Sequence, residues 1–238
     1  MKHSLVPSLI FLVACGGMQS PLDPGAGDSQ GTGTNTLLVT GNATASPRVA
    51  NAQAPGDFDT EFSVRIGLSG VPVTTGTVTV TSSTAVTPLT FTGTGDNAGH
   101  WVGSATGYDE VYKLDVTSGT DSVTGVIVDG PDIQTITAPT AGATIDSTMP
   151  FVATWQRAAA ADEADVQAGD INSITIVDSG TYSIAAGTLK ADQGKAKAAT
   201  LRLGRLNHVS PLGAVVGSEI SVGVDTEVDV VVAACPGC

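Results

Sequence analysis

Residues 62–68 read Phe-Ser-Val-Arg-Ile-Gly-Leu, and apolar side chains occupy every second position. The positions between them hold polar or small residues. An alternation with a period of two is typical of a strand that buries one face and exposes the other. We therefore expect a β-strand here, packed on one side of a core.

The same pattern recurs along the chain. Residues 71–81, Val-Pro-Val-Thr-Thr-Gly-Thr-Val-Thr-Val-Thr, repeat it after a turn that contains glycine. Further strands are expected at 89–92, 100–105, 112–117, 123–128, 151–155, 173–178, 181–184, 199–206, 219–224 and 227–233. Charged residues make up only 14% of the chain, which favours short strands over solvent-exposed helices. The sequence thus predicts an all-β fold.

A break in the pattern divides the chain into two parts. Proline and glycine at 130–131 and 138–140 interrupt the strands, which restart at Phe151. Residues 157–170, Arg-Ala-Ala-Ala-Ala-Asp-Glu-Ala-Asp-Val-Gln-Ala-Gly-Asp, depart from the strand pattern again. Because alanine favours helix while glycine and acidic residues favour loops, we expect a short helical turn there.

Two short stretches resemble immunoglobulin-like domains. Residues 112–116, Tyr-Lys-Leu-Asp-Val, resemble the tyrosine-corner strand of that fold. The proline-rich stop before the strand that carries Trp155 resembles the entry to a second immunoglobulin- or fibronectin-like module. These resemblances imply two tandem β-sandwich domains, at 37–137 and 138–238.

The N-terminus has the parts of an export signal. Lys2 precedes a short apolar stretch, which is well below the roughly 20 residues that a spanning helix needs. Residues 12–15, Leu-Val-Ala-Cys, resemble the lipobox of bacterial lipoproteins. The resemblance implies a signal peptide at 1–14, cleavage after Ala14 and lipidation of Cys15. An ordinary secretory signal with a chance cysteine is the alternative.

The composition after this signal limits location and partners. Residues 15–36 are rich in Gly, Pro, Ser and Thr and are expected to form a flexible linker after the lipid. Gly16 is not the aspartate that resembles an inner-membrane retention signal, which favours the outer membrane. The net charge of −13 opposes binding to nucleic acid, because an acidic protein gains nothing from counterion release.

Acidic side chains offer candidate ligands for a hard cation. Asp57, Asp59 and Glu61 alternate, so an extended backbone would place their oxygens on one side, where calcium could bind. An acidic, solvated strand entry is the favoured alternative. A second acidic group, with weaker spacing, consists of Asp162, Glu163, Asp165 and Asp170.

The chain ends in Cys235-Pro-Gly-Cys238, which has the spacing of thiol-disulfide exchange motifs. Those enzymes place the first thiol at a helix N-terminus, and no helix can follow here. We expect a disulfide between Cys235 and Cys238 in an oxidising compartment. Intermolecular pairing, metal binding and redox catalysis are weaker alternatives.

Catalytic groups are scarce. Gly27-Asp-Ser-Gln-Gly31 matches the string of serine hydrolases, but it lies in the expected linker. Beyond the signal only His100 and His208 could act as imidazole bases, and both are expected at turns or on the surface. We therefore expect neither an enzyme nor a cofactor.

These observations favour a membrane-anchored envelope lipoprotein with a structural or binding role and a protein or glycan partner. The alternative is a carbohydrate- or calcium-binding module. Its sugar-stacking surface would use aromatic residues such as Trp101 or Tyr108, although most aromatic side chains should lie in the core.

Overall fold

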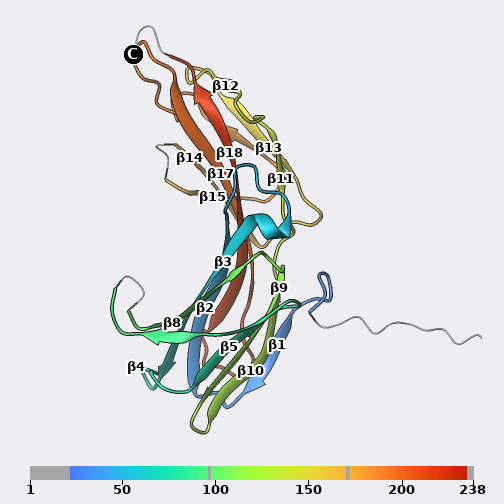
Figure 1. The fold of residues 1–238 in the computed structure, drawn as a ribbon, viewed down its shortest axis with the longest axis vertical. Helices are drawn as coiled ribbons and strands as arrows, with labels where there is room; N and C mark the ends of the chain where they lie inside the picture. Colours follow the sequence, from blue (N-terminus) through green and yellow to red (C-terminus); the bar gives the residue numbers. More distant parts are fainter. Residues whose placement is uncertain (1–21, 96–97, 170–171, 235–238) are drawn as a thin grey trace, which may run out of the picture.

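The computed structural model describes residues 22–95, 98–169 and 172–234. They form an elongated body of strands with one short 3₁₀ turn, η1 (Pro55–Asp57) (Figure 1). The predicted all-β class is confirmed. Within these residues, no helix has the length and apolar character needed to cross a membrane.

One large sheet runs the length of the molecule (Figure 1). Its main path has the order β15-β14-β17-β18-β2-β3-β8-β7, while β12 pairs with β18 and β4 pairs with β3. The strands of this sheet are β2 (Leu37–Pro47), β3 (Phe58–Leu68), β4 (Val71–Pro72), β7 (Thr90–Thr92), β8 (His100–Thr106), β12 (Thr144–Ile145), β14 (Glu163–Ala168), β15 (Ile174–Ile176), β17 (Lys197–Val209) and β18 (Glu219–Val232).

Two smaller sheets pack on the two halves of the large one. The first has the order β1-β10-β9-β5-β6, from β1 (Ser29–Gly33), β5 (Thr77–Thr81), β6 (Val86–Pro88), β9 (Val111–Ser118) and β10 (Asp121–Asp129). The second has the order β11-β13-β16, from β11 (Thr135–Ala138), β13 (Phe151–Gln156) and β16 (Thr181–Ile184). Each smaller sheet encloses a hydrophobic core with the large sheet. We call the core under the β1-β10-β9-β5-β6 sheet the first core and the core under the β11-β13-β16 sheet the second core.

The hairpin of β17 and β18 belongs to both cores. The two expected strands at 219–224 and 227–233 are one continuous strand, β18. Its lower half pairs in parallel with β2 and buries Val222 in the first core. Its upper half buries Val230 in the second core, and β17 pairs along its whole length. The large sheet is therefore continuous over both cores, although the sequence pattern breaks near residue 138.

The expected linker at 15–36 is corrected in its second half. Residues 29–33 form β1, which pairs with β10 from Ser29↔Ile127 to Gly33↔Val123. Backbone hydrogen bonds need no apolar side chain, so a Gly- and Thr-rich edge strand escapes detection by periodicity. Gly31 has a φ of +67°, and a Cβ there would lie 2.4 Å from the Thr124 carbonyl oxygen, so β1 also needs this glycine.

The helical turn expected at 157–170 is wrong. Residues 163–168 form β14, which pairs with β17 in the large sheet. Ala164, Val166 and Ala168 are buried in alternation, while the residues between them face outward. Because pairing and burial decide strand formation more strongly than intrinsic propensity, the alanines do not make a helix here.

Candidate functional site

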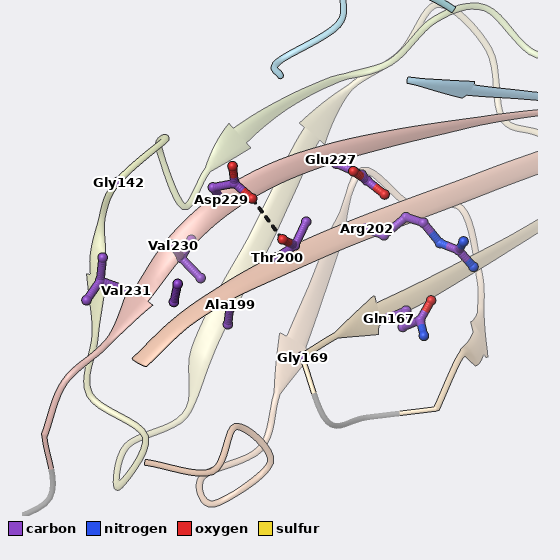
Figure 2. A pocket seen from close by; sticks show the side chains of 11 residues that line it. Gly142, Gln167, Gly169, Ala199, Thr200, Arg202, Glu227, Asp229, Val230 and Val231 are labelled. Atoms are coloured by element: carbon purple, nitrogen blue, oxygen red, sulfur yellow. Dashed lines mark hydrogen bonds between the residues drawn. The ribbon is translucent and has the colours of Figure 1, made fainter. Parts of the chain in front are cut away.

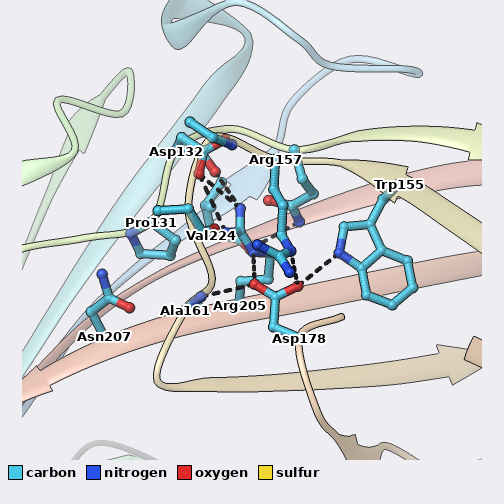
Figure 3. A network of polar contacts seen from close by, with 12 residues as sticks. Pro131, Asp132, Trp155, Arg157, Ala161, Asp178, Arg205, Asn207 and Val224 are labelled. Carbon is cyan, nitrogen blue, oxygen red and sulfur yellow. Dashed lines mark hydrogen bonds and ion pairs between the residues drawn. The ribbon is translucent and has the colours of Figure 1, made fainter. Parts of the chain in front are cut away.

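A buried arginine is the centre of a network of polar contacts (Figure 3). The side chain of Arg205 on β17 is fully buried, and its Nε donates to Asp178 Oδ2 at 2.9 Å. Its Nη1 donates to the Asp132 carbonyl oxygen at 2.8 Å. Since Asp132 lies in the connection between β10 and β11, this arginine ties that connection to the long hairpin.

Asp178 is the centre of the acidic side of this network (Figure 3). It accepts hydrogen bonds from Trp155 Nε1 and from the Ala161 backbone, each at 2.8 Å, and Arg157 Nε lies 3.1 Å away. Burial alone would raise the pKa of Asp178. The hydrogen bonds from Ala161 and Trp155, together with the charge of Arg205, outweigh burial and lower that pKa. The geometry is that of a structural ion pair.

A pocket of about 370 Å³ lies next to this network. Its lining includes Glu110, Asp129, Asp132 and Asn207. Burial, followed by the charges of Asp129 and Asp132, raises the pKa of Glu110 to about 7, although Arg205 opposes the shift.

A larger groove, of about 640 Å³, lies on the outer face of β14, β17 and β18 (Figure 2). Small residues such as Ala199 and Gly169 form part of its lining. Thr200 donates to Asp229 Oδ1 at 2.8 Å, and Gln167, Arg202 and Glu227 also line the groove. Hydroxyl, amide, guanidinium and carboxylate groups suit a hydrophilic ligand.

Two carboxylates converge on the same outer face. Asp165, Gly204 and Asp225 lie in one row across β14, β17 and β18. A Cβ on Gly204 would lie 2.4 Å from Asp165 Oδ2 and 2.8 Å from Asp225 Oδ1, so the glycine makes room for both. Burial raises the pKa of Asp225 to about 6, with Asp165 and Glu227 adding to the effect and Arg202 opposing it.

The structure does not bring the expected calcium ligands together. Asp57 ends η1, and its Oδ2 accepts hydrogen bonds from the backbone of Ala54 and Gln53. Asp59 lies 4.0 Å from Arg48, and Glu61 faces solvent on β3. Among the described residues, no group of three or more His, Cys, Asp or Glu side chains could hold a metal ion. Asp57 is instead a turn-capping residue, and its two backbone hydrogen bonds lower the pKa of the Asp57 carboxyl.

The second acidic group is also spread over other contacts. Asp162 accepts the His208 backbone N–H at 3.0 Å, and Glu163 begins β14 with its side chain outward. Asp165 accepts a hydrogen bond from Ser173. Asp170 lies outside the described residues.

The candidate catalytic residues have structural partners. Ser29 begins β1, where its Oγ accepts the Gly31 N–H at 3.3 Å. His100 Nδ1 lies 2.6 Å from Ser63 Oγ, and His208 Nδ1 lies 3.6 Å from Asp162. The structure thus places neither histidine in contact with Ser29.

The aromatic side chains considered for sugar stacking are buried. Trp101 is 6% exposed and donates through Nε1 to the Val73 carbonyl oxygen. Tyr108 is 3% exposed and donates to the Pro131 carbonyl oxygen. Tyr112 accepts the Asp109 N–H at 2.9 Å, a contact back to the preceding corner of the chain. Trp101 and Tyr108 therefore offer no stacking surface.

Three cysteines carried sequence-based predictions. Cys15, Cys235 and Cys238 all lie outside the described residues.

Sequence reasoning missed the Arg205 network and the outer groove. Arg205 stands among the alternating residues of β17 with no special spacing. Its burial follows from the packing of the 130–134 connection and Asp178 around it. No known protein family matches the chain, and no curated protein sequence matches it significantly.

Proposed function

We propose that this chain is a lipid-anchored protein of the bacterial cell envelope, without enzymatic activity, that binds a partner through its β-sandwich body. The observation that carries the proposal is the Leu-Val-Ala-Cys string at 12–15, which precedes the described body by only a few residues. A diacylated or triacylated Cys15 would hold the protein on the membrane, because two or more chains anchor stably where one does not. The absence of an aspartate at Gly16 favours the outer membrane.

The contacts of the polar side chains support a binding role over catalysis. Ser29 Oγ accepts a backbone hydrogen bond within the edge strand β1, and His208 Nδ1 lies 3.6 Å from Asp162. Arg205 and Asp178 neutralise each other inside the body. A reacting site needs a nucleophile within reach of an oriented base, and these residues are engaged elsewhere.

Metabolic labelling with a radioactive fatty acid tests the anchor. The full chain, expressed in a Gram-negative host, should incorporate the label and fractionate with the outer membrane. The Cys15→Ser variant should incorporate none and should leave the membrane fraction. Unlabelled wild-type protein with an unmodified Cys15 thiol by intact-mass analysis would reject the proposal.

The groove on β14, β17 and β18 favours a second candidate, binding of a hydrophilic glycan. Thr200, Arg202 and Asp229 supply donors and acceptors in a groove that small residues also line (Figure 2). A glycan array with the wild-type chain should give hits that Arg202→Ala abolishes and Arg48→Ala, outside the groove, retains. Hits that both variants retain would place binding elsewhere.

A further inference from the structure

Two buried side chains, one on β18 and one just before β11, hold polar atoms without a hydrogen-bond partner. Gln134 is fully buried and Thr226 is 3% exposed. Among the described residues, neither Gln134 Oε1 nor Thr226 Oγ1 meets a donor or an acceptor. Both residues line the same cavity, of about 240 Å³. Because a buried polar atom is costly when it is unpaired, two such atoms at one cavity point to a ligand.

The side-chain amide of Gln134 has a fixed orientation. Its Nε2 donates to the carbonyl oxygens of Leu203 at 2.9 Å and Val224 at 3.5 Å. A carbonyl oxygen only accepts, so the amide nitrogen must face these two groups and Oε1 is the free end of the amide. Thr226 lies directly across from Leu203 in the β17–β18 ladder, beside the residue that holds Gln134. A ligand here must therefore bring a donor for Oε1.

The cavity lies at a gap in the large sheet. On the side of β18 away from β17, β2 pairs with residues 219–224 and β12 pairs with residues 231–232. Within the described part of the chain, no strand pairs with residues 225–230 on that side. The cavity occupies this interval, where residues 51–53 of the β2–β3 connection meet the start of β11 (Figure 1). The interrupted pairing thus leaves room for a ligand beside β18.

The lining of this cavity disfavours charged ligands. Glu227 is the only charged residue among the described residues that line it. On β18 the Glu227 side chain faces outward, opposite to the buried Thr226 and Val228. An anion would therefore meet no cation in the cavity, and an ammonium group would meet no carboxylate. Since burying an unpaired charge costs more than burying a neutral polar group, a neutral ligand with hydroxyl groups fits best.

The size and the remaining lining of the cavity suit one sugar ring. A volume of about 240 Å³ is below the roughly 300–1,000 Å³ of pockets for drug-sized ligands, so the ligand is small. Ile136 and Val228 supply apolar contacts for the C–H groups of a ring. Asn51 and Gln53 are exposed lining residues, so their amides lie at the opening, where outer hydroxyl groups can bind.

We propose that this cavity, the β18 cavity, binds one neutral sugar ring. One hydroxyl group of the sugar donates to Gln134 Oε1, and a second forms a hydrogen bond with Thr226 Oγ1. The site is separate from the groove of β14, β17 and β18, because Thr226 faces the inner side of the sheet whereas Asp229 of that groove faces the outer side. It is also independent of the proposed lipid anchor.

Titration followed by nuclear magnetic resonance tests the β18 cavity. The isotope-labelled full chain with Cys15→Ser is titrated in turn with glucose, galactose, mannose and N-acetylglucosamine, and with glucuronate and glucosamine as charged counterparts. At least one neutral sugar should shift the side-chain amide of Gln134 and the backbone amides at 51–53, whereas the charged sugars should not. Thr226→Val should weaken this binding about tenfold, the loss expected for one hydrogen bond.

Two further variants make the result specific. Thr40→Val, on the outer face of β2, is the matched control and should retain the affinity of the wild-type chain. Ala141→Phe, at an exposed position of the lining, should block the cavity and abolish the shifts without altering a buried residue.

Other outcomes overturn the proposal. No shift at Gln134 with any of the sugars shows that water alone fills the cavity. Unchanged affinity in Thr226→Val or Ala141→Phe places the sugar elsewhere, and loss of binding in Arg202→Ala instead assigns it to the outer groove. Stronger binding of glucuronate or glucosamine rejects the neutral class. None of these results depends on Cys15, so failure here leaves the proposed anchor untouched.

Discussion

At the scale of single residues, the centre of the molecule depends on one buried charge. Arg205 has no exposed side-chain surface, and Asp178 and Asp132 surround its guanidinium. Such a pair stabilises little compared with apolar packing, but removing one partner leaves an uncompensated charge in the interior.

Arg205→Ala should therefore destabilise the protein by about 3–5 kcal/mol, because it strands Asp178 and opens space around it. Urea unfolding followed by fluorescence measures the change. Arg65→Ala, an exposed arginine on β3, is the control and should change the stability by less than about 0.5 kcal/mol. Equal effects of the two variants would remove the central role assigned to Arg205.

Asp225 gives the stability an uncommon dependence on pH. Burial raises its folded pKa to about 6, above the ordinary 3.8, so the folded state binds more protons than the unfolded state between these values. Stability should fall as the pH rises from about 4 to 6 and stay level above that window. Glu110 acts in the same direction, through a window from 4.5 to about 7.

Asp225→Asn should raise the stability at pH 8 by about 1–2 kcal/mol and have little effect at pH 4, where the wild-type carboxyl is protonated. Thermal unfolding at both pH values measures the difference. Glu61→Gln, on the exposed face of β3, is the control. A uniform effect of Asp225→Asn at both pH values would contradict the assigned cause.

At the scale of elements, close backbone approaches fix where strands end. Gly130 follows β10, and a Cβ there would lie 2.4 Å from Val222 Cγ1 and 2.9 Å from the Glu110 carbonyl oxygen. Only glycine fits at this point, where the chain leaves β10 close to β18. From here the chain enters the 130–134 connection, which contacts Arg205.

Gly130→Ala should cost about 2–3 kcal/mol, since backbone atoms must shift. Gly56→Ala, where a Cβ would meet nothing within 4 Å, should cost less than about 0.5 kcal/mol. Chemical denaturation of the two variants side by side makes the comparison. A neutral Gly130→Ala would show that the approach of β10 to β18 is looser than the structure has it.

At the scale of the whole molecule, β17 and β18 join the two cores into one cooperative unit. Val222 and Val230 belong to the same strand but to different cores. Since that strand cannot leave one core while keeping its register in the other, the cores should unfold together.

Two tryptophans report on this coupling, because Trp101 lies in the first core and Trp155 in the second. Trp101→Phe and Trp155→Phe each leave one reporter, and their urea transitions, compared within each variant with circular dichroism, should coincide. Leu114→Ala in the first core should shift the Trp155 transition by about 3 kcal/mol as well. If Leu114→Ala does not shift the unfolding transition reported by Trp155, the two cores are independent folding units.

The sequence by itself determined the β class and most strand positions, because alternation with a period of two reflects one-sided burial, a local property. The clearest cases are β16 at 181–184 and β9 at 111–118. The sequence also supplied the motif at Cys15 on which the proposed anchor depends. Both kinds of information lie within a few neighbouring residues.

Only the tertiary structure decided how those strands join. β1 and β14 form because partners distant in the sequence supply backbone hydrogen bonds, which no side-chain pattern reports. Arg205 is buried because Asp132 and Asp178, 73 and 27 residues away, converge on it. Each feature depends on long-range pairing, and therefore on the fold.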